Sequence, residues 1–235
     1  MHCGRKRWQV VLDQFIDDWI GLTSPRPRVT LGAFQQTDGC YWCGCDIESY
    51  TICQCTNRHL KWSRVFRLGK YESPLSDCIL QGKYSAWKAI LQLLGELLGT
   101  RLKGCVPPNS IVVPVPMPPF RRYFRRIDHA AEIARTLSKQ SGLPMRKVLW
   151  RKESLPQAAK TASARQKLKK NMIRMKPFAN VDGKSVVLVD DVLTTGRTLE
   201  VACDILRAAG ATSVVVAVVA VTQLPRKVKK CGLRF

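Results

Sequence analysis

Two adjacent carboxylates follow a short apolar run in the C-terminal third of the chain. The run is Val186–Val189, the acids are Asp190 and Asp191, and a turn of small polar residues at 194–196 comes shortly after them. In an open α/β sheet, ligands bind beyond the carboxyl ends of the strands. The sequence therefore predicts that a buried strand ends in this acid pair, and that the following turn opens a helix.

The turn and the first helical residues have the groups that a phosphate needs. Amides at a helix N-terminus point outward, and the helix dipole favours an anion there. Gly196 allows the backbone to approach a phosphate closely, and no Gly-Lys-Ser/Thr follows, so the turn is not a Walker loop. We predict a phosphate-binding turn at 194–198, here called the phosphate turn. Its residues are Thr194, Thr195, Gly196, Arg197 and Thr198.

The acid pair needs a different partner, because a carboxylate beside a phosphate is electrostatically unfavourable. Vicinal hydroxyls of a ribose, with a hard cation nearby, suit two carboxylates. The sequence therefore assigns Asp190 and Asp191 as catalytic residues that bind a sugar next to the phosphate. The alternative is that the two acids only cap the following helix.

A second group of reactive side chains lies nearer the N-terminus, where five of the ten cysteines fall between positions 40 and 55. Two cysteines separated by two residues present two thiolates to one tetrahedral zinc. The predicted ligands are Cys40, Cys43, Cys53 and Cys55, with Cys45 or His59 able to replace one of them. Four protein ligands leave no open position, so such a zinc would be structural. The alternative is a degenerate ribbon that carries only thiols.

The elements that position these residues alternate between helix and strand from residue 86 onward. Helical spacing of apolar residues predicts helices at 86–102, 127–139 and 198–209, the last one ended by Gly210. Apolar, valine-rich runs predict strands at 111–113, 186–189 and 214–221. Valine-rich strands separated by helices indicate an α/β fold with a parallel sheet. A further amphipathic helix is expected at 9–20.

Length and composition limit the class of protein. A chain of 235 residues fits one domain with a small appendage. With 46% hydrophobic and 24% charged residues, wholesale disorder is excluded. No run approaches the roughly 18 apolar residues of a membrane span. The basic first residues are followed by aspartates rather than an apolar core, which does not fit a signal peptide. We expect a cytoplasmic protein.

The charge is strongly positive and unevenly distributed. Lys and Arg total 39 against 17 Asp and Glu, a net charge of +22, and between Arg121 and Lys176 the ratio is 17 to 3. Such a field attracts polyanions, either nucleic acid, anionic lipid or phosphorylated small molecules. Tyr123 and Phe124 lie within basic residues 121–126 and favour single-stranded DNA, because bases stack on aromatic rings. Residues 151–170 have few large apolar side chains and form either a mobile loop or a solvated helix face.

These motifs together resemble a known family. The string Val186–Thr198 looks like the phosphoribosyl-pyrophosphate (PRPP) signature of type I phosphoribosyltransferases. The surroundings are similar to the ComF family, competence-protein-F-like proteins with an N-terminal zinc ribbon. The supporting residues are the cysteine cluster, Gly82-Lys83-Tyr84, Val113–Pro118, Arg125–Ala130, and Pro156-Gln157 with Arg165. The resemblance runs from about Cys40 to about Thr222.

The resemblance implies a role for each motif. The acid pair would bind the ribose hydroxyls of PRPP, and the phosphate turn would bind its 5′-phosphate. The loop Pro114–Pro118, here called the pyrophosphate loop, would contact pyrophosphate through Pro116 and Met117. Residues 151–170 would be a flexible hood that brings Lys160 and Arg165 to the leaving group. Mg²⁺ would bridge pyrophosphate and ribose.

The resemblance also implies a fold and a division of the chain. We expect a type I phosphoribosyltransferase-like sheet flanked by helices, with a small zinc-ribbon-like module. The expected parts are an N-terminal extension at 1–38, the zinc-ribbon-like module at 39–60, and the phosphoribosyltransferase-like domain with a basic tail at 61–235. One function is transfer of the phosphoribosyl group from PRPP to an acceptor. The alternative is a non-catalytic nucleic-acid-binding protein of DNA uptake or processing that retains the PRPP pocket.

Overall fold

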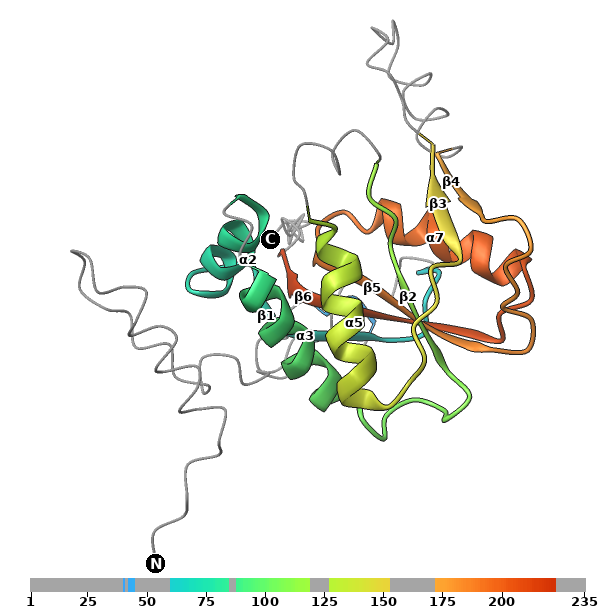
Figure 1. The fold of residues 1–235 in the computed structure, drawn as a ribbon, viewed down its shortest axis with the longest axis horizontal. Coiled ribbons are helices and arrows are strands. Elements are labelled where there is room, and N and C mark those ends of the chain that lie inside the picture. The colour runs from blue at the N-terminus through green and yellow to red at the C-terminus, as the bar shows by residue number, and fades with distance from the viewer. Residues whose placement is uncertain are drawn as a thin grey trace, which may run out of the picture.

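A parallel sheet organises the described part of the chain. The structure is a computed structural model, and it describes residues 40, 42–44, 60–84, 88–118, 127–152 and 172–222. In the described part, four strands lie in the order β1-β6-β5-β2, and all neighbours are parallel (Figure 1). The strands are β1 (Val65–Lys70), β2 (Ile111–Pro114), β5 (Ser185–Leu193) and β6 (Ser213–Val221). The carboxyl ends of parallel strands meet at one edge of the sheet, so this edge is where a ligand is expected.

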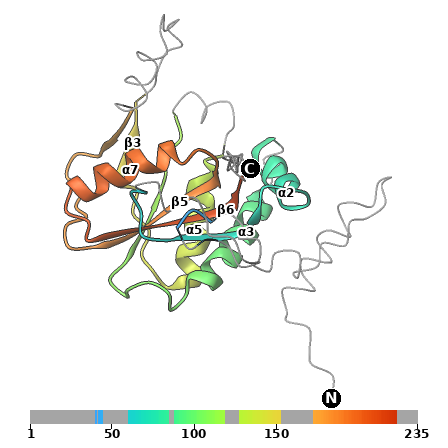
Figure 2. The same ribbon diagram turned by 180° about the vertical axis from the view of Figure 1, so that it is seen from behind.

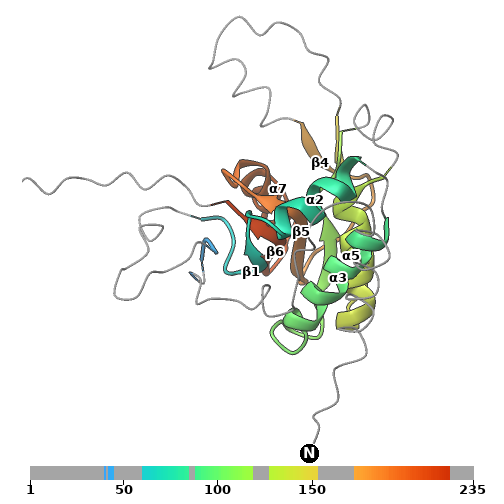
Figure 3. The ribbon, with the colours of Figure 1, turned by 90° about the vertical axis from the view of Figure 1, so that its left-hand side faces the viewer.

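Helices cover both faces of the sheet, as the edge-on view shows (Figure 3). On one face α3 packs against α5, and these two helices contact the sheet together with α2. On the other face lies α7, which is in front of the sheet in Figure 2. The helices are α2 (Leu75–Tyr84), α3 (Lys88–Leu102), α5 (His129–Ser141) and α7 (Arg197–Ala208). The predicted α/β fold, a parallel sheet flanked by helices, is confirmed.

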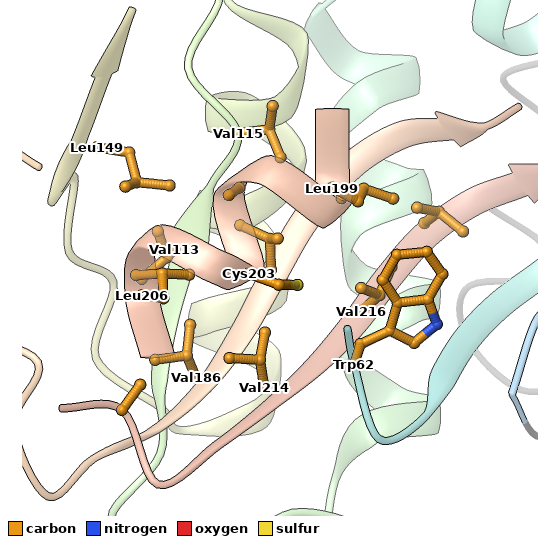
Figure 4. Packing of buried hydrophobic residues seen from close by; sticks show 14 of the residues in the cluster. Trp62, Val113, Val115, Leu149, Val186, Leu199, Cys203, Leu206, Val214 and Val216 are labelled. Carbon is orange, nitrogen blue, oxygen red and sulfur yellow. The ribbon is translucent and has the colours of Figure 1, made fainter. Parts of the chain in front are cut away.

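The two faces of the sheet form two apolar cores, which explains the valine-rich strands. Val187 and Val189 of β5 pack with α3 and α5, while Val186 and Leu188 pack with α7. A strand that is buried on both faces has no polar side, so it appears in the sequence as an uninterrupted apolar run. Figure 4 shows part of the α7 core, with Val186, Val214 and Val216 of the sheet facing Leu199 and Leu206.

The predicted helices are present with shifted ends. Helix α5 begins at His129 because Asp128 caps it, its carboxylate accepting a hydrogen bond of 3.2 Å from the Ala131 amide. Helix α7 runs from Arg197 to Ala208 rather than from 198 to 209. Cys203 of α7 is fully buried, and burial raises the pKa of its thiol to about 12. Cys203 is therefore a thiol of the apolar core between α7 and the sheet.

Four elements of the structure, one helix and three strands, have no counterpart in the predicted pattern. Strand β1 and helix α2 lie before the helix predicted at 86–102. Strand β1 carries Arg67, a charged residue that interrupts the apolar pattern but is buried. The other two are the strands of an antiparallel ribbon, β3 (Leu149–Arg151) and β4 (Ile173–Met175). Its strands are too short to give a periodic signal and pair across 21 intervening residues.

Several predictions fall on the part of the chain that the structure does not describe. The helix expected at 9–20 and the basic C-terminal tail lie outside the described residues. Most of the stretch 151–170 lies outside them as well. In the described ranges, every helix is too short or too polar to cross a membrane.

Candidate functional site

The acid pair lies inside β5 rather than after its end, which corrects the predicted strand boundary at Val189. The strand runs to Leu193 because β6 continues beside it, with Asp190 opposite Val218 and Leu193 opposite Val221. On its other side, β2 ends with Pro114 opposite Val189. Among the described strands, β5 therefore has a neighbour on one side only from Asp190 onward, and both acids are half-buried at this opening.

The regular alternation of side chains along β5 is interrupted at the acid pair. Val189 and Val192, three residues apart, both pack on the side of α3 and α5. Strict alternation would place them on opposite faces. Each acid also accepts a hydrogen bond from the next amide: Asp191 N–H to Asp190 Oδ1 at 2.9 Å, and Val192 N–H to Asp191 Oδ1 at 2.7 Å. Both carboxylates thus lean toward the carboxyl end of the strand, where a ligand is expected.

The phosphate turn joins the end of β5 to the start of α7, as the sequence predicts. Thr194 and Thr195 are exposed, whereas Gly196 is buried and has φ +74°, a left-handed conformation that favours glycine. Gly196 is the N-cap of α7, and no side chain caps the helix there. The first amides of a helix have no acceptor within the helix. A phosphate at this point would receive their hydrogen bonds, with Arg197 and Thr198 beside it.

The pyrophosphate loop leaves the sheet next to the acid pair. The Val115 amide donates a hydrogen bond of 2.8 Å to the Val189 carbonyl, so the loop begins beside Asp190. The loop then lines a cavity of about 500 Å³. Pro116 and Met117, the two residues assigned to pyrophosphate binding, are both in its lining. The acid pair and this loop therefore emerge from neighbouring strands at the same edge of the sheet.

The cavity has mainly cationic side chains among its charged lining. Lys147, Arg151 and Lys176 line it, against one carboxylate, Asp128, which also caps α5. Trp150 completes one side, and its indole N–H donates to the Met175 carbonyl at 3.0 Å. An excess of positive charge around a cavity of this size favours a small polyanion. Sequence reasoning did not single out Lys147 and Lys176, although the charge excess at 121–176 was the signal that contained them.

The base of the predicted hood lies at this cavity. Strands β3 and β4 pair antiparallel, and the Lys152 amide donates to the Met172 carbonyl at 2.7 Å. Residues 152 and 172 are therefore adjacent, and Arg151, next to residue 152, lines the cavity. Lys160 and Arg165, which were assigned to the hood, lie outside the described residues.

Only part of the predicted zinc site lies within the described residues. Cys40 and residues 42–44, here called the cysteine knuckle, are described, and Cys40 and Cys43 are buried. The Gly44 amide closes the knuckle with a hydrogen bond of 2.8 Å to the Cys40 carbonyl. The other candidate ligands, Cys45, Cys53, Cys55 and His59, lie outside the described ranges. Within those ranges, His, Cys, Asp and Glu do not gather in a group of three or more that could hold a metal.

The knuckle packs behind the phosphate turn, which the sequence did not indicate. Cys43 and Leu60 face the turn residues Thr194–Gly196 across a space of about 20 Å³. Trp62 lies between them and is 3% exposed. No periodic or charge signal marks Trp62 in the sequence, because its role depends on a contact across more than 130 residues.

The arrangement defines a class of site: paired carboxylates and a helix N-terminus at the carboxyl edge of a parallel sheet, beside a cationic cavity. Residues 128–231 match the family described as "Phosphoribosyl transferase domain". The matched region contains the acid pair, the phosphate turn, α5 and the β3–β4 ribbon. This part of the chain, somewhat less than half of it, is therefore similar to a phosphoribosyl transferase domain. No curated protein matches the chain.

Several solved structures resemble the chain. "Structure of the allosteric regulatory enzyme of purine biosynthesis" has 22% identity and a TM-score of 0.40, over 55% of this chain and 25% of that one. A purine phosphoribosyltransferase from Pyrococcus horikoshii has 22% identity and a TM-score of 0.37, over 57% of this chain and 74% of that one. A hypoxanthine phosphoribosyltransferase from Staphylococcus aureus has 15% identity and a TM-score of 0.34, over 60% and 69%. The chain spans a quarter of the first of these structures.

Proposed function

We propose that the protein binds PRPP with Mg²⁺ and transfers its phosphoribosyl group to an acceptor. The observation that carries this proposal is the convergence of three features at one edge of the sheet. These are the acid pair on β5, the phosphate turn at the start of α7, and the pyrophosphate loop beside a cationic cavity. The match of residues 128–231 to a phosphoribosyl transferase domain supports it.

The chemistry requires no nucleophilic side chain. The bond between ribose C1 and the pyrophosphate oxygen breaks, pyrophosphate leaves with the electron pair, and a lone pair of the acceptor forms the new bond to C1. Asp190 and Asp191 would hold the ribose hydroxyls and lie near the positive charge that develops on the sugar. Lys147, Arg151 and Lys176 would neutralise the leaving pyrophosphate, and fixed cations aimed at developing negative charge are an effective form of catalysis.

The acid pair fits the needs of a divalent cation as well. Mg²⁺ prefers oxygen ligands and keeps several waters, so one or two carboxylates beside phosphate oxygens are sufficient. Asp190 and Asp191 are half-buried carboxylates at the opening beside the pyrophosphate loop. When bound, Mg²⁺ would neutralise part of the charge on pyrophosphate.

Calorimetric titration with PRPP and Mg²⁺ tests the proposal without knowledge of the acceptor. The double variant Asp190→Asn/Asp191→Asn keeps the shape of both side chains and removes both charges. We expect a loss of PRPP affinity on the order of 100-fold, because hydrogen bonds to charged groups are strong. Asp204→Asn is the matched control, since Asp204 is exposed on α7 and pairs with Lys61 at 3.4 Å. Wild-type protein that fails to bind PRPP would refute the proposal.

Zinc binding and membership of the ComF family extend this proposal. The resemblance to that family, with a ribbon at 39–60 followed by a transferase-like domain at 61–235, is the basis. Cys40 and Cys43 supply two buried thiols in a closed turn, which fits half of a structural zinc site. Metal analysis of the purified protein should give about one zinc per chain if this site forms. A content near zero would contradict it.

Binding of single-stranded DNA is the second candidate function, favoured by the net charge of +22. Proteins that neutralise several phosphates lose affinity steeply as salt rises. Fluorescence anisotropy with a labelled single strand at several salt concentrations measures this slope. Tight, salt-dependent DNA binding by a protein that ignores PRPP would favour the non-catalytic function. Displacement of the strand by PRPP would indicate that both ligands share the cationic cavity.

A further inference from the structure

Trp62 lies directly behind the phosphate turn. A Cβ atom built on Gly196 would lie 2.9 Å from Cη2 of Trp62 and 3.3 Å from Cδ1 of Leu193. The six-membered ring of the indole is therefore in close contact with the backbone of the turn. Trp62 belongs to the apolar core on the side of α7 (Figure 4). Because the ring is buried and rigid, it sets how deeply the turn can lie against the sheet.

The same indole is fixed from the opposite side by the cysteine knuckle. Nε1–H of Trp62 donates a hydrogen bond of 2.7 Å to the carbonyl of Trp42. That carbonyl belongs to the turn that the Gly44 amide closes on Cys40. Gly44 has φ +70°, and a Cβ there would lie 3.0 Å from Val221 Cγ2 and 3.1 Å from Val65 Cγ1. The knuckle thus rests against side chains of β6 and β1 and cannot move without moving its hydrogen bond to Trp62.

Little space separates the two turns. The cavity between them is about 20 Å³ and is lined by Cys43, Leu60 and Trp62 on one side and by Leu193–Gly196 on the other. A volume of this size has room for about one water molecule. A shift of the knuckle or of the indole would therefore be transmitted to the phosphate turn rather than absorbed by empty space.

We propose that Trp62 is a positioning residue for the phosphate turn, and that it couples the conformation of the cysteine knuckle to the affinity for a sugar 5-phosphate. The inference rests on the proposed function, because it concerns the same site. Main-chain amides bind an anion only in the directions that the backbone allows. A turn that is held in its binding conformation before the ligand arrives does not lose affinity to an ordering step.

The two ends of PRPP allow a selective test. Ribose 5-phosphate carries the group that the phosphate turn would bind, and pyrophosphate carries the group assigned to the cationic cavity. Trp62→Phe removes the N–H donor and shortens the ring that contacts Gly196. We expect calorimetry on the full chain to show ribose 5-phosphate affinity lowered about tenfold, with pyrophosphate affinity unchanged. A merely structural role for Trp62 would weaken both ligands or neither, and either result would overturn the inference.

A neighbouring residue provides the matched control. The hydroxyl of Ser63 donates a hydrogen bond of 3.1 Å to the carbonyl of Val214, at the start of β6. Ser63 is the residue next to Trp62. Ser63→Ala therefore removes a side-chain hydrogen bond to a main-chain carbonyl and leaves the phosphate turn unchanged. We expect this variant to bind both ligands as the wild type does. A loss for ribose 5-phosphate equal to that of Trp62→Phe would contradict a specific role of the indole.

A second variant tests the coupling at a distance. Gly44→Ala places a side chain against Val221 and Val65 in a left-handed conformation, so the knuckle must shift. We expect lower affinity for ribose 5-phosphate and unchanged affinity for pyrophosphate, although Gly44 lies in the knuckle and not in the phosphate turn. Wild-type affinity for ribose 5-phosphate in a folded Gly44→Ala protein would overturn the coupling.

Hydrogen exchange on the wild-type protein needs no variant. It therefore tests the coupling between the cysteine knuckle and the phosphate turn even if Trp62→Phe and Gly44→Ala both prevent folding. Coupling between two sites is reciprocal. Ribose 5-phosphate should slow amide exchange in peptides that contain residues 42–44 and 60–64, whereas pyrophosphate should not. Binding of ribose 5-phosphate without this protection would overturn the inference alone. Failure of the wild type to bind either PRPP or ribose 5-phosphate would instead overturn the proposed function, and the inference with it.

Discussion

The two halves of the candidate site are built in opposite ways. The half assigned to pyrophosphate is an open cavity of about 500 Å³ with three cationic side chains in its lining. The half assigned to the 5′-phosphate is a turn of small residues at a helix N-terminus. Trp62 packs behind this turn, and the cavity beside them is only about 20 Å³. One half therefore offers charged side chains around an open cavity, and the other offers main-chain amides in a fixed conformation.

This difference corresponds to the two tasks that PRPP would set. Pyrophosphate carries more charge and must leave after the reaction, so an open cavity lined by several cations is suitable. The 5′-phosphate stays attached to the product and only has to fix the ribose above the acid pair. A rigid turn gives the more precise alignment of the reacting carbon. The comparison predicts that substitutions will act on one half without changing the other.

The largest selective effect is expected from Gly196→Ala. The new methyl group would meet Trp62 at 2.9 Å, and the residue would have to keep φ +74°. We expect affinity for ribose 5-phosphate to fall on the order of 100-fold, since displacement of the turn misaligns several amides at once. The left-handed conformation alone costs about 1–2 kcal/mol in the free energy of unfolding.

Gly183→Ala separates the loss of ribose 5-phosphate affinity from the loss of unfolding free energy. Gly183 has φ +65°, and a Cβ there would meet nothing within 4 Å. This variant should show the loss of unfolding free energy in a urea titration, with normal binding of ribose 5-phosphate. If Gly183→Ala also lost phosphate binding, the effect at Gly196 would be one of general stability and not of the turn.

A smaller effect is expected in the open half from Lys147→Ala. Removal of one cation from the cavity should lower pyrophosphate affinity about tenfold, because hydrogen bonds to charged groups are strong but two further cations remain in the lining. The dependence of affinity on salt should become weaker, and ribose 5-phosphate should bind normally. Lys184→Ala is the control, since Lys184 is exposed before β5. An equal loss of affinity for pyrophosphate and for ribose 5-phosphate would contradict the assignment of these ligands to separate halves of the site.

The smallest effect concerns the scaffold of the open half and depends on pH. Burial alone would raise the pKa of Glu132 on α5, but hydrogen bonds from Gln92 and Arg135 and the charges of Arg135 and Lys88 outweigh it, so the pKa is lowered. A carboxylate with a lowered pKa in the folded state adds stability above its unfolded pKa of about 4.3 and loses it in more acidic solution. Urea unfolding of the wild type should therefore show stability falling between about pH 5 and pH 3.

Glu132→Gln should be less stable than the wild type at neutral pH and should lose less stability on acidification. Glu96→Gln, with an exposed side chain on α3, is the control and should follow the wild type. If the Glu132→Gln protein lost as much unfolding free energy on acidification as the wild type, the contacts of Glu132 with Gln92, Arg135 and Lys88 would not stabilise α5. Neither variant should change which half of the site binds which ligand.

The sequence predicted the parts of the site that depend on local pattern. The order of apolar run, acid pair, turn and helix at 186–198 is local, so the phosphate turn and the start of α7 could be predicted within a residue. The strand β2 could be predicted because it is a short apolar run ended by Pro114, whereas the pyrophosphate role of the following loop came from the family resemblance and stays a prediction. The predicted end of β5 at Val189 is wrong, and the strand ends at Leu193, because pairing with β6 sets its length and the residues of β5 themselves do not.

The parts that depend on distant contacts could not be predicted. Trp62 acts through Gly196 and Trp42, residues far from it in the sequence on either side. Lys147 and Lys176 lie before β3 and after β4, and only the pairing of these strands brings them to one cavity. Charge counts located the cationic region but not the cations that line the cavity.

The most direct test of the account is a crystal structure of the protein with PRPP and Mg²⁺. The account predicts the ribose at Asp190 and Asp191, the 5′-phosphate on the amides of residues 194–198, and pyrophosphate in the cavity lined by Lys147, Arg151 and Lys176. PRPP bound away from this edge of the sheet, or bound with its two phosphate ends exchanged, would contradict it.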